Sequence, residues 1–111
     1  MKRTVISYKV RPETAAVNEQ LIRGVFDELA QAEPENVSYT AFALEDGVSF
    51  LHVVEVEEGD NPIPALPSFK RYSEAVLERC QEQPVVNQAR EIGTYQGSAW
   101  DVGIPSPQPL R

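Results

Sequence analysis

Stretches of alternating hydrophobicity and stretches of helical periodicity follow one another along the chain. Residues 4–10 (TVISYKV) are rich in β-branched residues and alternate, with Thr4, Ile6, Tyr8 and Val10 on one side, which predicts a first strand. Pro12 ends it, because proline cannot donate to a strand ladder. Residues 13–31 change to a four-residue period and predict an amphipathic helix with the apolar stripe Val17, Leu21, Val25 and Leu29, flanked by Ile22 and Phe26.

Two further alternating runs, residues 37–47 and 48–58, meet at Asp46-Gly47. This dipeptide between apolar runs is typical of a hairpin with a type I′ turn, in which both central residues have positive φ. The two runs are therefore expected to be antiparallel neighbours. The second run places Phe50, His52, Val54 and Val56 on one side and Leu51, Val53 and Glu55 on the other.

The second half of the chain predicts one more helix and one more strand. Apolar residues at helical spacing over residues 69–82 indicate an amphipathic helix, which Ser68 would cap and Pro84 would end. Cys80 falls on its apolar stripe and is expected to be a small buried filler. Residues 90–99 (REIGTYQGSA) form the last expected strand.

The predicted order β-α-β-β-α-β indicates an α+β fold, the ferredoxin-like plait: a four-stranded antiparallel sheet with both helices on one face. A solvated second face should be polar at alternate positions. Here it carries Leu51 and Val53 together with Phe42 and Leu44 of the preceding strand. We therefore expect a second copy of the chain to cover it, giving a homodimer with its sheets face to face, a dimeric α/β barrel.

Three stretches resemble the antibiotic biosynthesis monooxygenase (ABM) family: VISYKVRPE, ENVSYTAFALEDG and FLHVVEVEE. The resemblance runs from residue 4 to about residue 97 and implies a dimeric α/β barrel with an ABM-type domain over residues 1–99. Residues 100–111 are rich in proline, which predicts an extended or mobile tail. Glu55 matches the glutamate of the family's Glu-x-Trp pattern, but Glu57 takes the place of the tryptophan. The histidine that family members often carry in the second helix has no counterpart here.

Composition excludes several functional classes. The 111 residues fit one domain, and 17 acidic against 10 basic residues give a net charge of −7. Without a basic cluster, a nucleic-acid or anionic-membrane surface is not expected. One cysteine and no apolar leader segment indicate a cytoplasmic protein, and one histidine with one cysteine excludes the common zinc motifs. We expect no cofactor; an acidic strand end is the interpretation for Glu55, Glu57, Glu58 and Asp60, with a carboxylate metal site the weaker alternative.

His52 is the candidate catalytic residue. Its ordinary pKa near neutrality suits a general base or a hydrogen-bond donor to a bound oxygen. The alternative is a half-buried histidine whose nitrogens are satisfied by a cross-strand tyrosine or a backbone carbonyl. The family's tryptophan position falls on the side of Glu55, so His52 faces away from the corresponding pocket unless a bulge shifts the alternation.

The other candidates are side chains that could bind a ligand. Tyr39, Tyr72 and Tyr8 combine an apolar ring with a hydroxyl and could line a cavity for a planar oxygenated compound; Tyr95 shares these properties, and all four could equally be core or interface residues. Arg90 could hold an anionic group or be a surface residue. Trp100 could contact the partner subunit or cover the sheet edge.

Two functions remain open. The first is a small-molecule-binding dimer that acts as a cofactor-independent monooxygenase or isomerase on an aromatic or polyketide-like compound. The second is a non-catalytic homodimeric binding or stress-associated module of the same fold. A cavity between sheet and helices with His52 or two tyrosine hydroxyls directed into it favours the first, and a filled interior favours the second.

Overall fold

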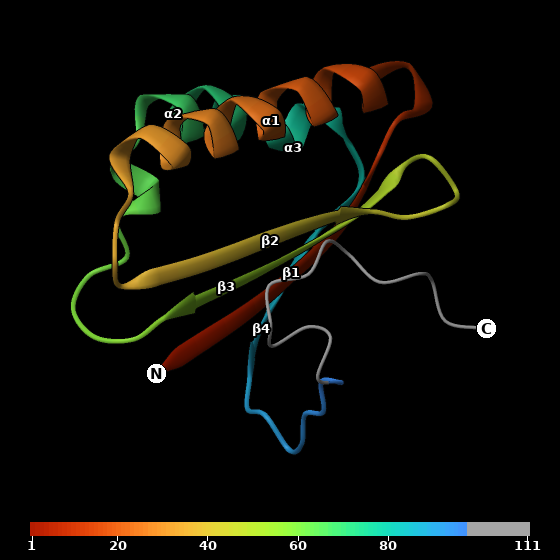
Figure 1. Ribbon diagram of the computed structural model, residues 1–111. Helices are drawn as coiled ribbons and strands as arrows, with labels where there is room; N and C mark the ends of the chain where they lie inside the picture. The colour runs from red at the N-terminus through yellow and green to blue at the C-terminus, as the bar shows by residue number, and fades with distance from the viewer. Residues whose placement is uncertain (98–111) are drawn as a thin grey trace.

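A single sheet carries all its helices on one side (Figure 1). The computed structural model describes residues 1–97. The strands are β1 (Lys2–Val10), β2 (Val37–Ala43), β3 (Ser49–Val56) and β4 (Cys80–Ala89), and the helices are α1 (Ala15–Ala32), α2 (Pro67–Glu74) and α3 (Val76–Arg79), with short 3-10 turns at Pro12–Thr14 and Ile63–Ala65. The predictions for Trp100, for a domain boundary at residue 99 and for the tail lie outside the described residues.

The sheet order is β2-β3-β1-β4, and every neighbouring pair is antiparallel. This is the order of the ferredoxin-like plait, so the predicted fold class is confirmed. The register places His52 opposite Ile6 of β1 and Ala41 of β2. No shift interrupts the pairing of β3 with either neighbour over Phe50–Val56, and no bulge changes which way His52 points.

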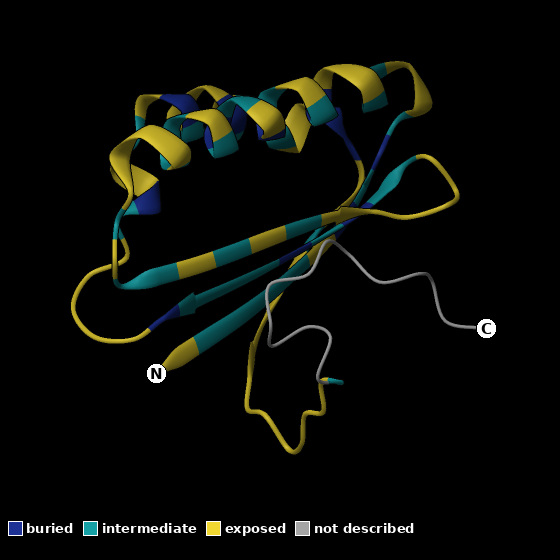
Figure 2. Cartoon of the chain, in the orientation of Figure 1, coloured by how far each residue is buried: buried dark blue, intermediate teal, exposed yellow. Residues whose placement is uncertain are grey.

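The core lies between the sheet and the helices (Figure 2). Alternation along β3 buries Phe50, His52 and Val56, as the pattern predicted, and α1 contributes Ile22 and Val25. The stripe predicted for α1 is wrong at one end. Val17 is 54% exposed, whereas Asn18 is fully buried. Hydrophobic periodicity missed this residue because its amide is held by polar partners inside the core.

The predicted second helix and last strand are wrong in their boundaries. Helix α2 ends at Glu74, the single turn α3 follows, and β4 begins at Cys80, so Cys80 is buried as expected but on a strand. Pro84 lies inside β4 rather than ending a helix. The pairing of β4 with β1 shifts between Ser7 and Lys9, which leaves an irregularity opposite Tyr8. An edge strand tolerates proline at such a bulge because no ladder hydrogen bond is needed there.

Residues 90–97, predicted as strand, contain none. The strand that the fold requires comes earlier and includes the β-branched pair Val85-Val86. Arg90 therefore follows the last strand instead of opening it. Tyr95 is 89% exposed, which excludes a position in the core of this chain.

The β2–β3 hairpin is confirmed, but its turn is not the predicted two-residue type. Only Gly47 has positive φ (82°), and β2 already ends at Ala43. The Asp46 carboxylate organises the longer loop by accepting hydrogen bonds from the backbone N–H groups of Val48 (2.9 Å) and Ser49 (2.8 Å). A local side-chain acceptor of this kind favours a turn over continued pairing.

The start of α2 is also stabilised differently from the prediction. Pro67 occupies the first turn, where its missing N–H costs no hydrogen bond, and Ser68 does not act as the cap. Instead, Glu28 of α1 accepts a hydrogen bond from the Ser68 backbone N–H at 2.9 Å. This contact joins the two helices above the sheet.

The face of the sheet away from the helices carries an apolar strip. The register aligns Phe42, Leu51, Ser7 and Val85 in one row across the four strands, and Thr40, Val53, Val5 and Asn87 in the next. Phe42 and Val85 are strongly exposed and Leu51 and Val53 are half-buried.

Within residues 1–97, no helix is long and apolar enough to cross a membrane.

Candidate functional site

His52 lies on the helix-covered face of the sheet and is 3% exposed. Its direct cross-strand neighbours, Ile6 and Ala41, have no polar side-chain atoms. Its polar neighbours come from the two diagonals. Tyr8 is opposite Phe50, two residues before His52, and Tyr39 is opposite Val54, two residues after it. Diagonal positions in a sheet lie within reach of aromatic side chains, so one tyrosine approaches each side of the imidazole.

Each ring nitrogen of His52 contacts one of these hydroxyls. The Tyr8 Oη atom lies 3.0 Å from His52 Nε2, and the Tyr39 Oη atom lies 2.6 Å from His52 Nδ1. The Tyr72 hydroxyl of α2 donates to Tyr8 Oη at 2.7 Å. Three of the tyrosines singled out in the sequence therefore meet around the one histidine, and Tyr95 does not.

Two residues that the sequence did not single out extend this cluster. Asn18 of α1 donates through Nδ2 to Tyr8 Oη at 3.0 Å and accepts through Oδ1 from Arg79 Nε at 3.0 Å. Arg79, which is 7% exposed, also donates to the backbone oxygen of Tyr72 at 2.7 Å and lies 5.5 Å from the centroid of the Tyr72 ring. The cation–π contact and these two hydrogen bonds stabilise the buried charge.

One weak signal for these residues exists in the sequence. Asn18 continues the buried positions Ile22 and Val25 at helical spacing, and Arg79 is seven residues after Tyr72. A polar residue within an apolar stripe indicates a buried polar network, but only the structure identifies its partners.

Burial keeps the cluster neutral except for Arg79. It lowers the pKa of His52 to about 4, because the charged imidazolium is poorly solvated there. Burial also raises the pKa of Tyr39 and of Tyr72 well above the ordinary value. The pKa of Tyr8 is raised by burial, against the opposing effect of its hydrogen bonds from Asn18 and Tyr72. At neutral pH the site thus holds protonated tyrosines and an uncharged histidine.

A cavity of about 210 Å³ lies against this cluster. Tyr8, Tyr39, His52 and Tyr72 all line it, together with the polar residues Asn61 and Ser73. The remaining wall is largely apolar, and the full lining is Ile6, Tyr8, Tyr39, His52, Val54, Asn61, Ile63, Pro64, Phe69, Tyr72, Ser73, Val76 and Pro84. An apolar cavity with a few convergent polar groups is the usual form of a small-molecule site. Cavities of about 150 Å³ can hold benzene, so this one has room for a single substituted ring.

A wider and more open depression, of about 540 Å³, shares Ile6, Val54 and Asn61 with the cavity. It lies at the end of β3 and includes the acidic residues Glu57, Glu58 and Asp60. We regard the smaller cavity as the candidate site, because it contains the buried polar cluster.

Within the described part of the chain, no three side chains of the histidine, cysteine or acidic type are arranged to hold a metal ion.

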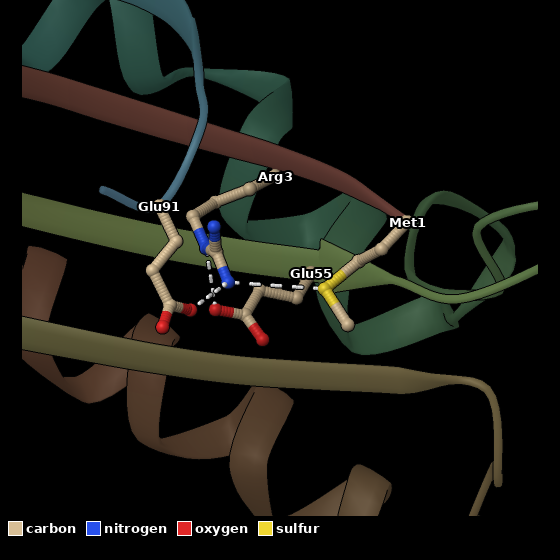
Figure 3. A network of polar contacts seen from close by, with 4 residues as sticks. All are labelled: Met1, Arg3, Glu55 and Glu91. Atoms are coloured by element: carbon tan, nitrogen blue, oxygen red, sulfur yellow. Dashed lines mark hydrogen bonds and ion pairs between the residues drawn. The ribbon is translucent and has the colours of Figure 1, made fainter. Parts of the chain in front are cut away.

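Glu55 is separated from the cavity by the sheet itself. It lies on the opposite face of β3, where Arg3 donates to its carboxylate at 2.6 Å and to Glu91 at 3.2 Å (Figure 3). Arg90, a candidate for binding an anionic group or a surface residue, is exposed and does not line the cavity. The structure therefore brings His52, Tyr8, Tyr39 and Tyr72 together and leaves Arg90 apart.

The fold has many relatives among solved structures, although no family model matches the chain and no curated protein is similar to it in sequence. A protein described as a putative antibiotic biosynthesis monooxygenase from Bacteroides thetaiotaomicron aligns with a TM-score of 0.69 at 17% identity, over 86% of this chain and 95% of that one. Rv0793 from Mycobacterium tuberculosis aligns with a TM-score of 0.67 at 15% identity, over 86% and 98%. A mutant of SnoaB, a cofactor-independent oxygenase from Streptomyces nogalater, aligns with a TM-score of 0.56 at 18% identity, over 81% and 93%.

The chain has the fold of the ABM proteins, as the resemblance implied. At these identities the likeness concerns the backbone and assigns neither a substrate nor a reaction. The chemistry must be argued from the cluster around His52.

Proposed function

We propose that the protein binds a small, planar, oxygen-bearing ring compound in the cavity and acts on it without a cofactor, as a monooxygenase or an isomerase. One observation carries this proposal: a largely apolar cavity of about 210 Å³ that is lined by the buried cluster of His52 with Tyr8, Tyr39 and Tyr72. The volume favours a one-ring compound over the fused rings of a polyketide. SnoaB, a cofactor-independent oxygenase, has the same fold.

Both reactions can begin by the same step, the development of negative charge on a substrate oxygen as an enolate or phenolate forms. In the oxygenase case the electron-rich carbon of this anion reacts with dioxygen from solution, which is the oxidant. One oxygen atom stays on that carbon as a carbonyl, and the other leaves as water with the two hydrogens that the substrate has lost. The largely apolar walls strengthen a hydrogen bond to that oxygen, because fewer water molecules compete for it. We assign Tyr39 to this contact and His52 to holding Tyr39 in place, since His52 Nδ1 lies 2.6 Å from its hydroxyl.

One observation favours the second candidate, a non-catalytic binding module of the same fold. Both ring nitrogens of His52 already have hydroxyl partners, and its pKa is about 4, so it is a weak base at neutral pH. A group outside the His52 ring would have to take the substrate proton. A binding protein needs no such group.

A panel of one-ring hydroquinones, phenols and β-dicarbonyl compounds separates these possibilities. Binding is measured by calorimetry and turnover by dioxygen consumption and product analysis, with Tyr39→Phe and His52→Ala as the matched variants. Turnover that falls in both variants supports the enzyme. Binding without turnover supports the binding module, and the absence of both rejects the proposal.

We also propose that the active form is a homodimer joined through the open sheet face. Phe42, Leu51 and Val85 form an apolar row on this face, and the half-buried Val53 in the next row extends it. An exposed apolar surface of this kind usually marks an interface. Leu51→Glu should produce a monomer in analytical ultracentrifugation, whereas Glu45→Gln in the adjoining loop should leave the dimer intact. A wild-type monomer at micromolar concentration would rule out this assembly.

A further inference from the structure

The hydrogen bonds of the cluster form one continuous series from Arg79 to Tyr39, and their direction can be determined. A guanidinium group has only donors. Arg79 Nε therefore donates to Asn18 Oδ1, and this fixes the orientation of the Asn18 amide. Its NH2 group must then face Tyr8 Oη and donate to it.

The Tyr8 hydroxyl accepts two hydrogen bonds and donates one. Its hydroxyl oxygen has two lone pairs and one hydrogen. The Tyr72 hydroxyl has no other hydrogen-bond partner among the described residues, so its hydrogen is directed at Tyr8 Oη, 2.7 Å away. The two lone pairs of Tyr8 therefore accept from Tyr72 and from Asn18 Nδ2 at 3.0 Å. Its hydrogen is left for the remaining partner, His52 Nε2, at 3.0 Å.

This assigns the tautomer of His52. A neutral imidazole has one N–H, and Nε2 is an acceptor here, so the hydrogen lies on Nδ1. Nδ1 then donates to Tyr39 Oη at 2.6 Å. The hydroxyl hydrogen of Tyr39 has no acceptor among the described residues, and Tyr39 lines the cavity.

We infer that Arg79, acting through Asn18 and Tyr8, holds His52 as the Nδ1–H tautomer and makes the Tyr39 hydroxyl a hydrogen-bond donor to the cavity, so that the ligand presents an acceptor oxygen there, as a ketone, quinone or enolate does. The statement about the ligand, which we call the ligand half of the inference, rests on the proposed function. The statement about the His52 tautomer, the tautomer half, does not. The charge of Arg79 lies at the donor end of the series, and it polarises the bonds so that each donor points away from it, toward Tyr39. Arg79 and Asn18 are positioning residues for Tyr39.

The tautomer can be read directly in the ligand-free protein. His52 is the only histidine of the chain, so the nitrogen-15 spectrum of a tag-free protein contains one imidazole. We expect a protonated Nδ1 and an unprotonated Nε2 at pH 7. A spectrum with the hydrogen on Nε2 would overturn the assignment, whatever the function of the protein.

Asn18→Asp tests whether Arg79 sets the direction. The carboxylate remains ionised beside Arg79 and can only accept, so the Tyr8 hydrogen turns toward residue 18. Tyr8 then accepts from His52, whose hydrogen moves to Nε2, and Tyr39 donates to Nδ1 instead of to the cavity. The control, Gln20→Glu, adds the same charge at an exposed position of α1. A folded Asn18→Asp protein that keeps the Nδ1–H form refutes the relay, and if the variant does not fold, the wild-type spectrum still decides the tautomer.

The ligand half is tested with acetophenone and ethylbenzene, which differ in one carbonyl oxygen. Tyr39→Phe should weaken acetophenone binding about tenfold, which corresponds to one neutral hydrogen bond, and should leave ethylbenzene unchanged. Equal effects on both probes contradict a donor role for Tyr39. If neither probe binds the wild-type protein, the ligand half and the proposed cavity function fail, while the nitrogen-15 result stands by itself.

Discussion

Acidification should destabilise the protein through His52 before its carboxylates titrate. In the unfolded chain His52 has a pKa of 6.5, and in the folded protein burial lowers this pKa to about 4. Between these values the unfolded chain binds a proton that the folded protein does not. The stability attributable to neutral His52 is therefore complete above pH 6.5 and is lost as the pH falls toward 4.

The expected loss is large for a domain of this size. Over the full interval the linkage is worth roughly 3 kcal/mol, and between pH 7 and pH 5 about 2 kcal/mol. Small domains have a total stability of only about 5–15 kcal/mol. With a urea dependence of about 1–3 kcal/mol per molar, the denaturation midpoint should fall by about 1 M between these two pH values.

The groups around His52 support this choice of interval. Tyr8 and Tyr39 contact it and stay protonated in this range, because burial raises the pKa of each. Glu28 and Asp46 have lowered pKa values through their hydrogen bonds, so the stability they contribute is lost only at more acidic pH. No carboxylate lines the cavity as the described residues define it.

The assay is urea denaturation followed by circular dichroism at pH 7, 6 and 5, at one protein concentration because dimerisation would shift the midpoint. His52→Gln is the matched variant, since its amide can accept from Tyr8 and donate to Tyr39 without titrating. It should lose most of the pH dependence of the wild type. Equal slopes for the two proteins, or an imidazole pKa near 6.5 by NMR, would refute the reasoning.

Three further predictions follow from packing and capping. Phe50→Ala should lower the free energy of unfolding by about 3–5 kcal/mol in urea denaturation, because Phe50 is buried in the core, whereas Phe42→Ala on the open face should cost a dissociated monomer much less. Cys80 should react with a thiol reagent far more slowly in the folded protein than in urea, since burial limits access and raises its pKa; equal rates would contradict its placement. Glu28→Gln should lower the melting temperature measured by calorimetry, because an ionised carboxylate is a stronger acceptor for the Ser68 N–H, and an unchanged value would contradict a stabilising role.

Alternation in the sequence was sufficient to predict which side chains share a face within each strand. Tyr8 falls with Ile6, and His52 falls with Phe50 and Val54, as the pattern required. Alternation could not show that these faces of the separate strands form one face of the sheet, or that the helices bury them equally. That depends on the register between strands, which places Tyr8 and Tyr39 on opposite diagonals of His52.

The errors came from residues whose local preference was overridden by pairing. Pro84 predicts the end of a helix, but the irregular pairing opposite Tyr8 accommodates it within an edge strand. The helical spacing from residue 69 to residue 80 is real, yet β4 begins at Cys80 because the sheet needs a fourth strand beside β1. Propensity within a segment carries no information about such a requirement.

These boundary errors and the hidden part of the site have the same origin. Arg79 is the last residue of α3, immediately before the strand β4. The predicted helix over residues 69–82 would have placed Arg79 inside a helical turn, with no reason to single it out. Where the helix ends, its side chain reaches Asn18 of α1 and its cation contacts the ring of Tyr72. The choice between a catalytic and a structural His52 cannot then be made from the imidazole alone, since both nitrogens are satisfied and the direction of their hydrogen bonds is set by Arg79. What the cavity can bind depends on the Tyr39 hydrogen at the other end of that series.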